Sequence, residues 1–166
     1  MDNILKVLVT LLLFSAFFGC INPMDDSLQK MNLLQQKYFV TQSFSTNQST
    51  MTDYITSLAD LKKSASGENA KILEAEIYLA ESFNYQNKAL SESTKLNYVA
   101  FNCSSIEAKS MINYINLAFN LNNLAKTSYA ELSVSQKEKL RSNYSELLNG
   151  YNEQISMMKT FVETKC

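Results

Sequence analysis

Three carboxylates come closest to forming a chemical site in this sequence. Glu74, Glu76 and Glu81 lie close together in one stretch that is expected to be helical. Glu74 and Glu81 are seven residues apart and share a helix face, whereas Glu76 does not. We therefore interpret the three carboxylates as a solvated helix face rather than as a metal or acid–base site.

Residues that many catalytic mechanisms require are missing. The sequence contains no histidine and no tryptophan. A Ser-His-Asp triad, the Glu-x-x-His pattern of di-iron bundles and the Cys-x-x-Cys-His haem motif therefore cannot form. There is also no Gly-rich phosphate loop and no nucleophile elbow. We predict that the protein is not an enzyme and has no cofactor and no metal site.

Tyrosines remain as candidate ligand-binding residues. A tyrosine joins an apolar ring to a polar hydroxyl, so several around one cavity could hold a small amphipathic ligand. The more common arrangement puts the ring at the core edge and the hydroxyl in water. The candidates are Tyr38, Tyr78, Tyr85, Tyr98, Tyr114, Tyr144 and Tyr151. Met111, Met157 and Met158 are interpreted as core residues.

Composition limits both the partner class and the fold class. The formal net charge is -1, so no basic excess is present to neutralise phosphates, and we expect no nucleic-acid partner. Only three glycines and one proline occur in 166 residues. So few helix breakers favour long helices over a strand-and-turn protein.

Apolar residues recur at three- and four-residue steps through four segments. The first helix is expected over residues 23–63. Its polar middle at residues 45–50 could be a break, but we favour a continuous or kinked helix, and residues 64–67 form a linker. The second covers residues 68–102. The third begins after Ser104 or Ser105 and ends near residue 131. The fourth covers residues 135–166, with Ser135 and Glu138 at capping-box spacing.

Short connections between amphipathic helices make antiparallel neighbours. The predicted fold is all-α, an antiparallel up-down-up-down four-helix bundle formed by residues 20–166 as a single domain. The alternative is a three-helix or irregular bundle whose first helix packs separately as a stalk.

An apolar run over residues 7–18 precedes this domain. Lys6 stands before the run, and Gly19-Cys20 follows it. A charged start, a short apolar core and a small residue at its end are typical of a secretory signal. Phe17-Phe18-Gly19-Cys20 resembles the lipobox of prokaryotic membrane lipoproteins. The resemblance implies removal of residues 1–19, lipidation of Cys20 with acyl chains such as palmitate, and attachment to the extracytoplasmic face of a membrane.

Two alternatives to this processing stay open. The run could be a retained anchor, although a membrane-crossing helix needs roughly 20 apolar residues. It could also be an ordinary signal peptide that has a cysteine nearby by chance. In that case the mature protein would be secreted without lipid.

The cysteine count adds a second expectation. Three cysteines in an exported chain leave one unexplained. Lipidation of Cys20 would leave Cys103 and Cys166, which both follow the end of a helix that returns to the membrane-proximal end of the bundle. We therefore predict a disulfide between Cys103 and Cys166 at that end.

Asn-x-Ser sequons occur at Asn47, Asn102 and Asn143. They matter only where secreted chains are glycosylated, and chance explains them in a sequence so rich in Asn and Ser.

Together these observations predict a lipid-anchored helical lipoprotein. We expect it to be a non-enzymatic binding or structural module at the cell surface or periplasmic face, with a possible protein partner. Binding is expected on a helix face or at membrane-distal loops around residues 64–67 and 128–135. The alternatives are a secreted carrier of a small amphipathic ligand and a membrane-tethered inhibitor or immunity protein.

Overall fold

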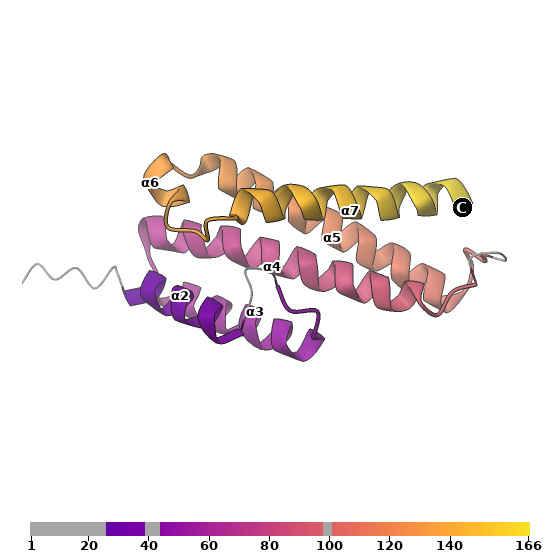
Figure 1. Cartoon of the computed structure of the whole chain (residues 1–166), viewed down its shortest axis with the longest axis horizontal. Coiled ribbons are helices and arrows are strands. Elements are labelled where there is room, and N and C mark those ends of the chain that lie inside the picture. Colours follow the sequence, from indigo (N-terminus) through magenta and orange to yellow (C-terminus); the bar gives the residue numbers. More distant parts are fainter. Residues whose placement is uncertain (1–25, 39–43, 98–100) are drawn as a thin grey trace, which may run out of the picture.

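A computed structural model describes residues 26–38, 44–97 and 101–166, and this part of the chain is all-α (Figure 1). The predicted signal peptide, its alternatives and Cys20 lie outside these residues. The described elements are α2 (Asp26–Tyr38), α3 (Gln48–Ser64), α4 (Gly67–Ser93), α5 (Ile106–Glu131), α6 (Val134–Lys137) and α7 (Tyr144–Lys165).

Two long antiparallel helices, α4 and α5, form the centre of the bundle and share its most extensive contact. The Ser82 hydroxyl in α4 donates to the Ala118 carbonyl in α5 at 2.9 Å. Helix α7 packs on α5, and Asn122 of α5 donates to the Leu148 carbonyl of α7. Helices α2 and α3 cover only the half of α4 that follows Gly67 (Figure 1).

The single first helix predicted over residues 23–63 is wrong, because the structure contains two antiparallel helices there. The polar middle forms a helix start. The side chain of Asn47 accepts a hydrogen bond from the Thr50 backbone N–H and caps α3. The preceding Phe44 is only 4% exposed. Burial of its ring just before a side-chain cap allows the chain to reverse direction.

The fourth helix also begins later than predicted. Ser133 and Gln136, rather than Ser135 and Glu138, form the capping box, and it starts the short α6. The chain then leaves the helix so that Leu140 and Arg141 can enter the interior, where Leu140 is 5% exposed. A new helix, α7, starts at Tyr144. The linker predicted at residues 64–67 is present but shorter, because α3 ends at Ser64 and α4 begins at Gly67. Gly67 there has a φ of +56°, a left-handed conformation that glycine adopts at little cost.

Different helix ends and connections lie at the two ends of the bundle. The Gly67 end contains the starts of α2 and α4 and the connections on either side of α6; there Asn69 donates to the Ser27 hydroxyl at 3.2 Å. The disulfide end contains the start of α5, Cys103 and Cys166. Since the first predicted helix is really a pair, α2 starts at the end opposite the disulfide. Cys103 and Cys166, which were expected at the membrane-proximal end, therefore lie at the end opposite Asp26, where the described chain begins.

Aromatic rings fill the middle of the core. Phe44 and Phe83 lie 5.4 Å apart between ring centroids, and Tyr151 stacks on Phe44 at 6.0 Å. Residues before α3, within α4 and within α7 thus meet in one cluster. Among the described helices, none is both long and apolar enough to cross a membrane.

Candidate functional site

A buried ion pair lies between α4 and the connection from α6 to α7, next to α3. Glu76 projects from α4 and has a fully buried side chain, and the side chain of Arg141 is 9% exposed. A guanidinium nitrogen of Arg141 donates to Oε1 of Glu76. Arg141 is the only arginine in the sequence, and it stands in the connection between α6 and α7.

Two aromatic residues complete this charged cluster. The Tyr54 hydroxyl, from α3, donates to the same Oε1 of Glu76 at 2.7 Å. The Arg141 guanidinium also lies over the Phe44 ring, 4.4 Å from its centroid, a distance typical of a cation–π contact. One carboxylate of α4 therefore holds α3 on one side and the α6–α7 connection on the other.

The environment fixes the protonation of these groups. Burial raises the pKa of Tyr54 well above its ordinary value, and the neighbouring Glu76 carboxylate raises that pKa further. Burial alone would lower the pKa of Arg141, but the charges of Glu76 and Tyr54 and the hydrogen bonds to both residues together outweigh it, so the pKa is raised. At neutral pH the guanidinium is therefore charged and the phenol is neutral.

Two further tyrosines share this region. The hydroxyl of Tyr144 donates to the Ala75 carbonyl at 2.7 Å, and burial raises its pKa. Burial also raises the pKa of Tyr151 to about 12, although the charge of Arg141 and a backbone hydrogen bond from Phe44 oppose the shift. These hydroxyls are bonded to protein groups, so the arrangement is suited to holding helices in position.

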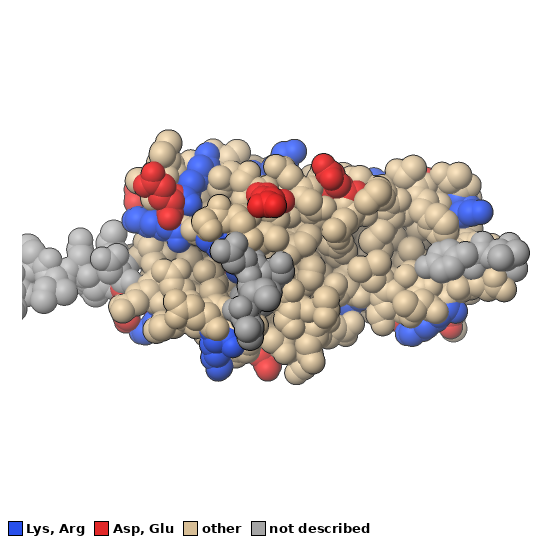
Figure 2. Space-filling model, viewed as in Figure 1, with Lys and Arg blue, Asp and Glu red and all other residues tan. Residues whose placement is uncertain are grey.

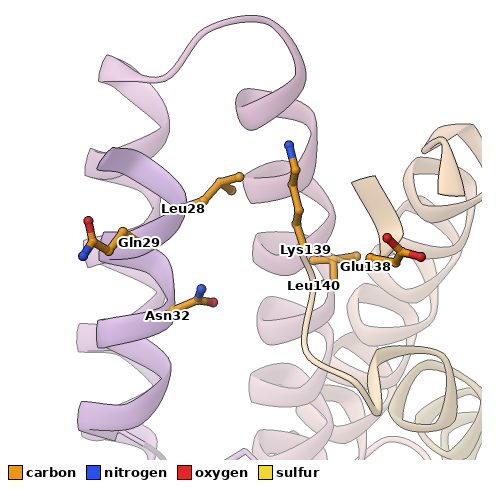
Figure 3. A pocket seen from close by; sticks show the side chains of 6 residues that line it. All are labelled: Leu28, Gln29, Asn32, Glu138, Lys139 and Leu140. Carbon is orange, nitrogen blue, oxygen red and sulfur yellow. The ribbon is translucent and has the colours of Figure 1, made fainter. Parts of the chain in front are cut away.

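Open grooves flank the cluster at the Gly67 end. The first, of about 450 Å³, separates α2 from the connection before α7 (Figure 3). Leu28 and Leu140 are both buried, while Gln29, Asn32, Glu138 and Lys139 provide its polar lining. Figure 3 shows Leu28 and Asn32 pointing from α2 toward the connection.

A second groove, of about 440 Å³, lies between the end of α5 and the start of α7. Tyr129 and Tyr144 line it as a stacked pair with centroids 5.1 Å apart. Lys137 lies over the Tyr129 ring, and Val134 is 76% exposed at the rim. Both grooves are of a size that small ligands or peptide side chains occupy.

The three carboxylates expected on a solvated face lie in three environments. Glu76 is buried, so that interpretation is wrong for it. Glu74 is one-third exposed and pairs with Lys62 at 3.0 Å; hydrogen bonds from Lys62 and Tyr78 lower its pKa. Glu81 is half-buried, and burial raises its pKa. The structure does not gather the three into a site, and among the described residues no His/Cys/Asp/Glu cluster could hold a metal ion.

The six candidate tyrosines that the structure describes do not surround one cavity. Tyr85 and Tyr114 meet at 6.0 Å across α4 and α5, with Lys88 over both rings. Tyr38 packs on Tyr54 in the other half of the molecule. Tyr78 bonds Glu74, and Tyr98 lies outside the described residues. Met111 is a core residue as predicted, whereas Met157 is 65% exposed, so its assignment to the core is wrong.

The predicted pairing of Cys103 with Cys166 is present as a disulfide with a Cα–Cα distance of 5.8 Å. Among the sequon residues, Asn47 caps α3 and Asn102 accepts from the Ser104 backbone N–H. Asn143 precedes α7, and the next residue, Tyr144, is buried.

Comparison with known proteins adds no assignment. No protein family, curated protein or solved structure matches the chain.

Sequence reasoning missed the ion pair. Glu76 and Arg141 stand 65 residues apart and have no shared motif. The one available signal was the unique arginine among many lysines, because arginine is the cation that proteins prefer for buried pairs.

Proposed function

We propose that this chain is a lipid-anchored extracytoplasmic protein whose helical domain acts as a non-enzymatic binding or structural module. The observation that carries the proposal is the disulfide between Cys103 and Cys166. It accounts for two of the three cysteines, so Cys20, directly after the apolar run and Gly19, is the one left for lipid.

The disulfide also bears on the compartment. Structural disulfides form and persist in oxidising surroundings and are rare in the reducing cytosol. This agrees with an exported domain. A single acyl chain binds a membrane only weakly, whereas two or more chains on one cysteine give a stable anchor. The domain would then remain tethered at the membrane face.

The use of polar side chains in the interior supports the non-enzymatic part of the proposal. The buried carboxylate Glu76 and the hydroxyls of Tyr54 and Tyr144 are bonded to other protein groups. The surface in Figure 2 carries acidic and basic side chains interspersed among uncharged ones. The two grooves beside α6 are the concave surfaces that we assign to binding.

Fractionation of cells that express the native gene tests the anchor. The wild-type protein should sediment with membranes and incorporate radiolabelled palmitate. Cys20→Ser should lose the label and either leave the membrane fraction or accumulate as the uncleaved precursor. Ser15→Ala, a change within the apolar run, is the matched control and should behave like wild type. Full-length, unlabelled wild-type protein in the membrane would contradict lipidation and favour a retained anchor.

A further inference from the structure

The point where the described chain begins fixes one end of the molecule. Asp26 starts α2, and the next residue, Ser27, bonds Asn69 in the first turn of α4. Asp26 therefore lies at the Gly67 end. The disulfide end is separated from it by the length of α4, a helix of 27 residues, which is about 40 Å at 1.5 Å per residue.

Chain length limits how far Cys20 can lie from Asp26. Six residues span at most about 21 Å when fully extended. A lipidated Cys20 lies at the membrane surface, so Asp26 must lie within that distance of the membrane. An inverted arrangement, with the disulfide end against the lipid, would require about twice that reach.

We propose that the Gly67 end of the bundle faces the lipid headgroups and that the disulfide end points away from the membrane. This orientation rests on the proposed lipid anchor at Cys20. The membrane-facing tip then consists of the start of α2, the turn at residues 65–66 and the connections on either side of α6. The grooves lined by Leu140 open at this tip, next to the bilayer.

Surface charge is mixed both on α7 and at the tip. On α7, Glu146 and Glu153 stand with Lys159 and the exposed Lys165, and at the tip exposed lysines are interspersed with carboxylates. The short reach from Cys20 to Asp26, and not surface charge, therefore carries the orientation.

The orientation reverses an expectation from the sequence. Connections around residues 64–67 and 128–135 were expected to be membrane-distal binding loops. In this orientation they are membrane-proximal. A large partner in the surrounding medium would instead meet the disulfide end, where Ile106 is 80% exposed.

Two matched tryptophan reporters can measure this orientation, because the native chain contains no tryptophan. Ile106 and Val134 are each the first residue of a helix, and each follows a serine whose side chain caps that helix. They are 80% and 76% exposed, so either tolerates a larger ring. Helix α5, of 26 residues, separates them by about 39 Å.

The experiment uses V134W and I106W as lipidated mature proteins that begin at Cys20. Each is reconstituted into phosphatidylcholine vesicles that contain a trace of dansyl-labelled phosphatidylethanolamine. Flotation first establishes binding to the vesicles, and circular dichroism confirms the helical fold of each variant. Energy transfer from tryptophan to dansyl is then compared. We expect transfer from V134W to exceed that from I106W several-fold.

The outcomes separate the lipid anchor from the orientation. Protein that fails to float contradicts the lipid anchor, and the orientation falls with it. Protein that floats but shows equal transfer from the two positions contradicts the upright orientation alone and indicates a bundle lying on its side. Greater transfer from I106W would also overturn the orientation.

Discussion

At the scale of single residues, the ion pair Glu76–Arg141 joins α4 to the α6–α7 connection, and Tyr54 of α3 bonds the same carboxylate. A buried charge is costly to desolvate, so the pair adds little net stability compared with an apolar replacement, but loss of one partner is expensive. Its value here is positional, because Oε1 of Glu76 in α4 bonds Tyr54 of α3 and Arg141 of the α6–α7 connection at the same time.

Arg141→Met should lower the free energy of unfolding by about 3–5 kcal/mol, because it leaves the Glu76 carboxylate buried without its counter-charge. Urea denaturation measures the change. Lys139→Met, at an exposed position two residues earlier, should stay within about 0.5 kcal/mol of wild type. The double variant Glu76→Leu with Arg141→Met should recover most of the loss. Equal effects of the Arg141 and Lys139 changes would show that the pair is dispensable.

Alkaline pH should destabilise the fold through its buried tyrosines. An unfolded tyrosine ionises near pH 10, whereas burial raises the pKa of Tyr151 to about 12. Since the folded pKa is the higher one, this contribution is complete below about pH 10 and is lost as the pH rises toward 12. Unfolding free energies measured across that range should fall, and less steeply for Tyr151→Phe. The same slope in both proteins would contradict this role of Tyr151.

At the scale of elements, sequence periodicity predicted the all-α class, the position of α5 and the start of α4. It placed the end of α4 near residue 102, whereas the helix ends at Ser93. It failed where tertiary burial overrode helical spacing. The segment around Phe44 reads as a helix with a polar turn, but burial of Phe44 and capping by Asn47 divide it. The burial of Leu140 and Arg141 likewise divides the last segment. These choices depend on packing partners that are distant in sequence.

Asn47→Ala tests the division of the first predicted helix. The change removes the side-chain acceptor for the Thr50 backbone N–H, so it should cost about 1 kcal/mol of unfolding free energy. Asn47→Asp retains an acceptor and should match wild type. If Asn47→Ala has no effect, or raises the helical circular dichroism signal, the chain favours the continuous helix that periodicity predicted.

At the scale of the whole molecule, the disulfide ties the end of α7 to the segment before α5 and closes a loop across a sequence separation of 63. The pairing itself followed from the cysteine count and the order of antiparallel helices. The end of the bundle at which the disulfide lies was not predicted correctly, because one extra helix reverses the direction of every helix after it. A correct pairing can therefore follow from an incorrect helix count.

Reduction of this disulfide should lower the unfolding free energy by about 4 kcal/mol, since the crosslink restricts the unfolded chain. The variant with serine at both Cys103 and Cys166 should have the same stability as the reduced wild type. It should also be unaffected by reductant. Equal unfolding free energies of the reduced and oxidised proteins would contradict a stabilising role of the disulfide.

The central claim is that Cys20 becomes the lipidated first residue of an exported helical domain. Mass spectrometry of the N-terminal peptide, from protein purified out of its native membrane, tests this most directly. We predict a peptide that begins at Cys20 and carries the mass of a diacylglyceryl group, with or without a further acyl chain on its amine. A peptide that begins upstream of Cys20, or an unmodified Cys20, would contradict the claim.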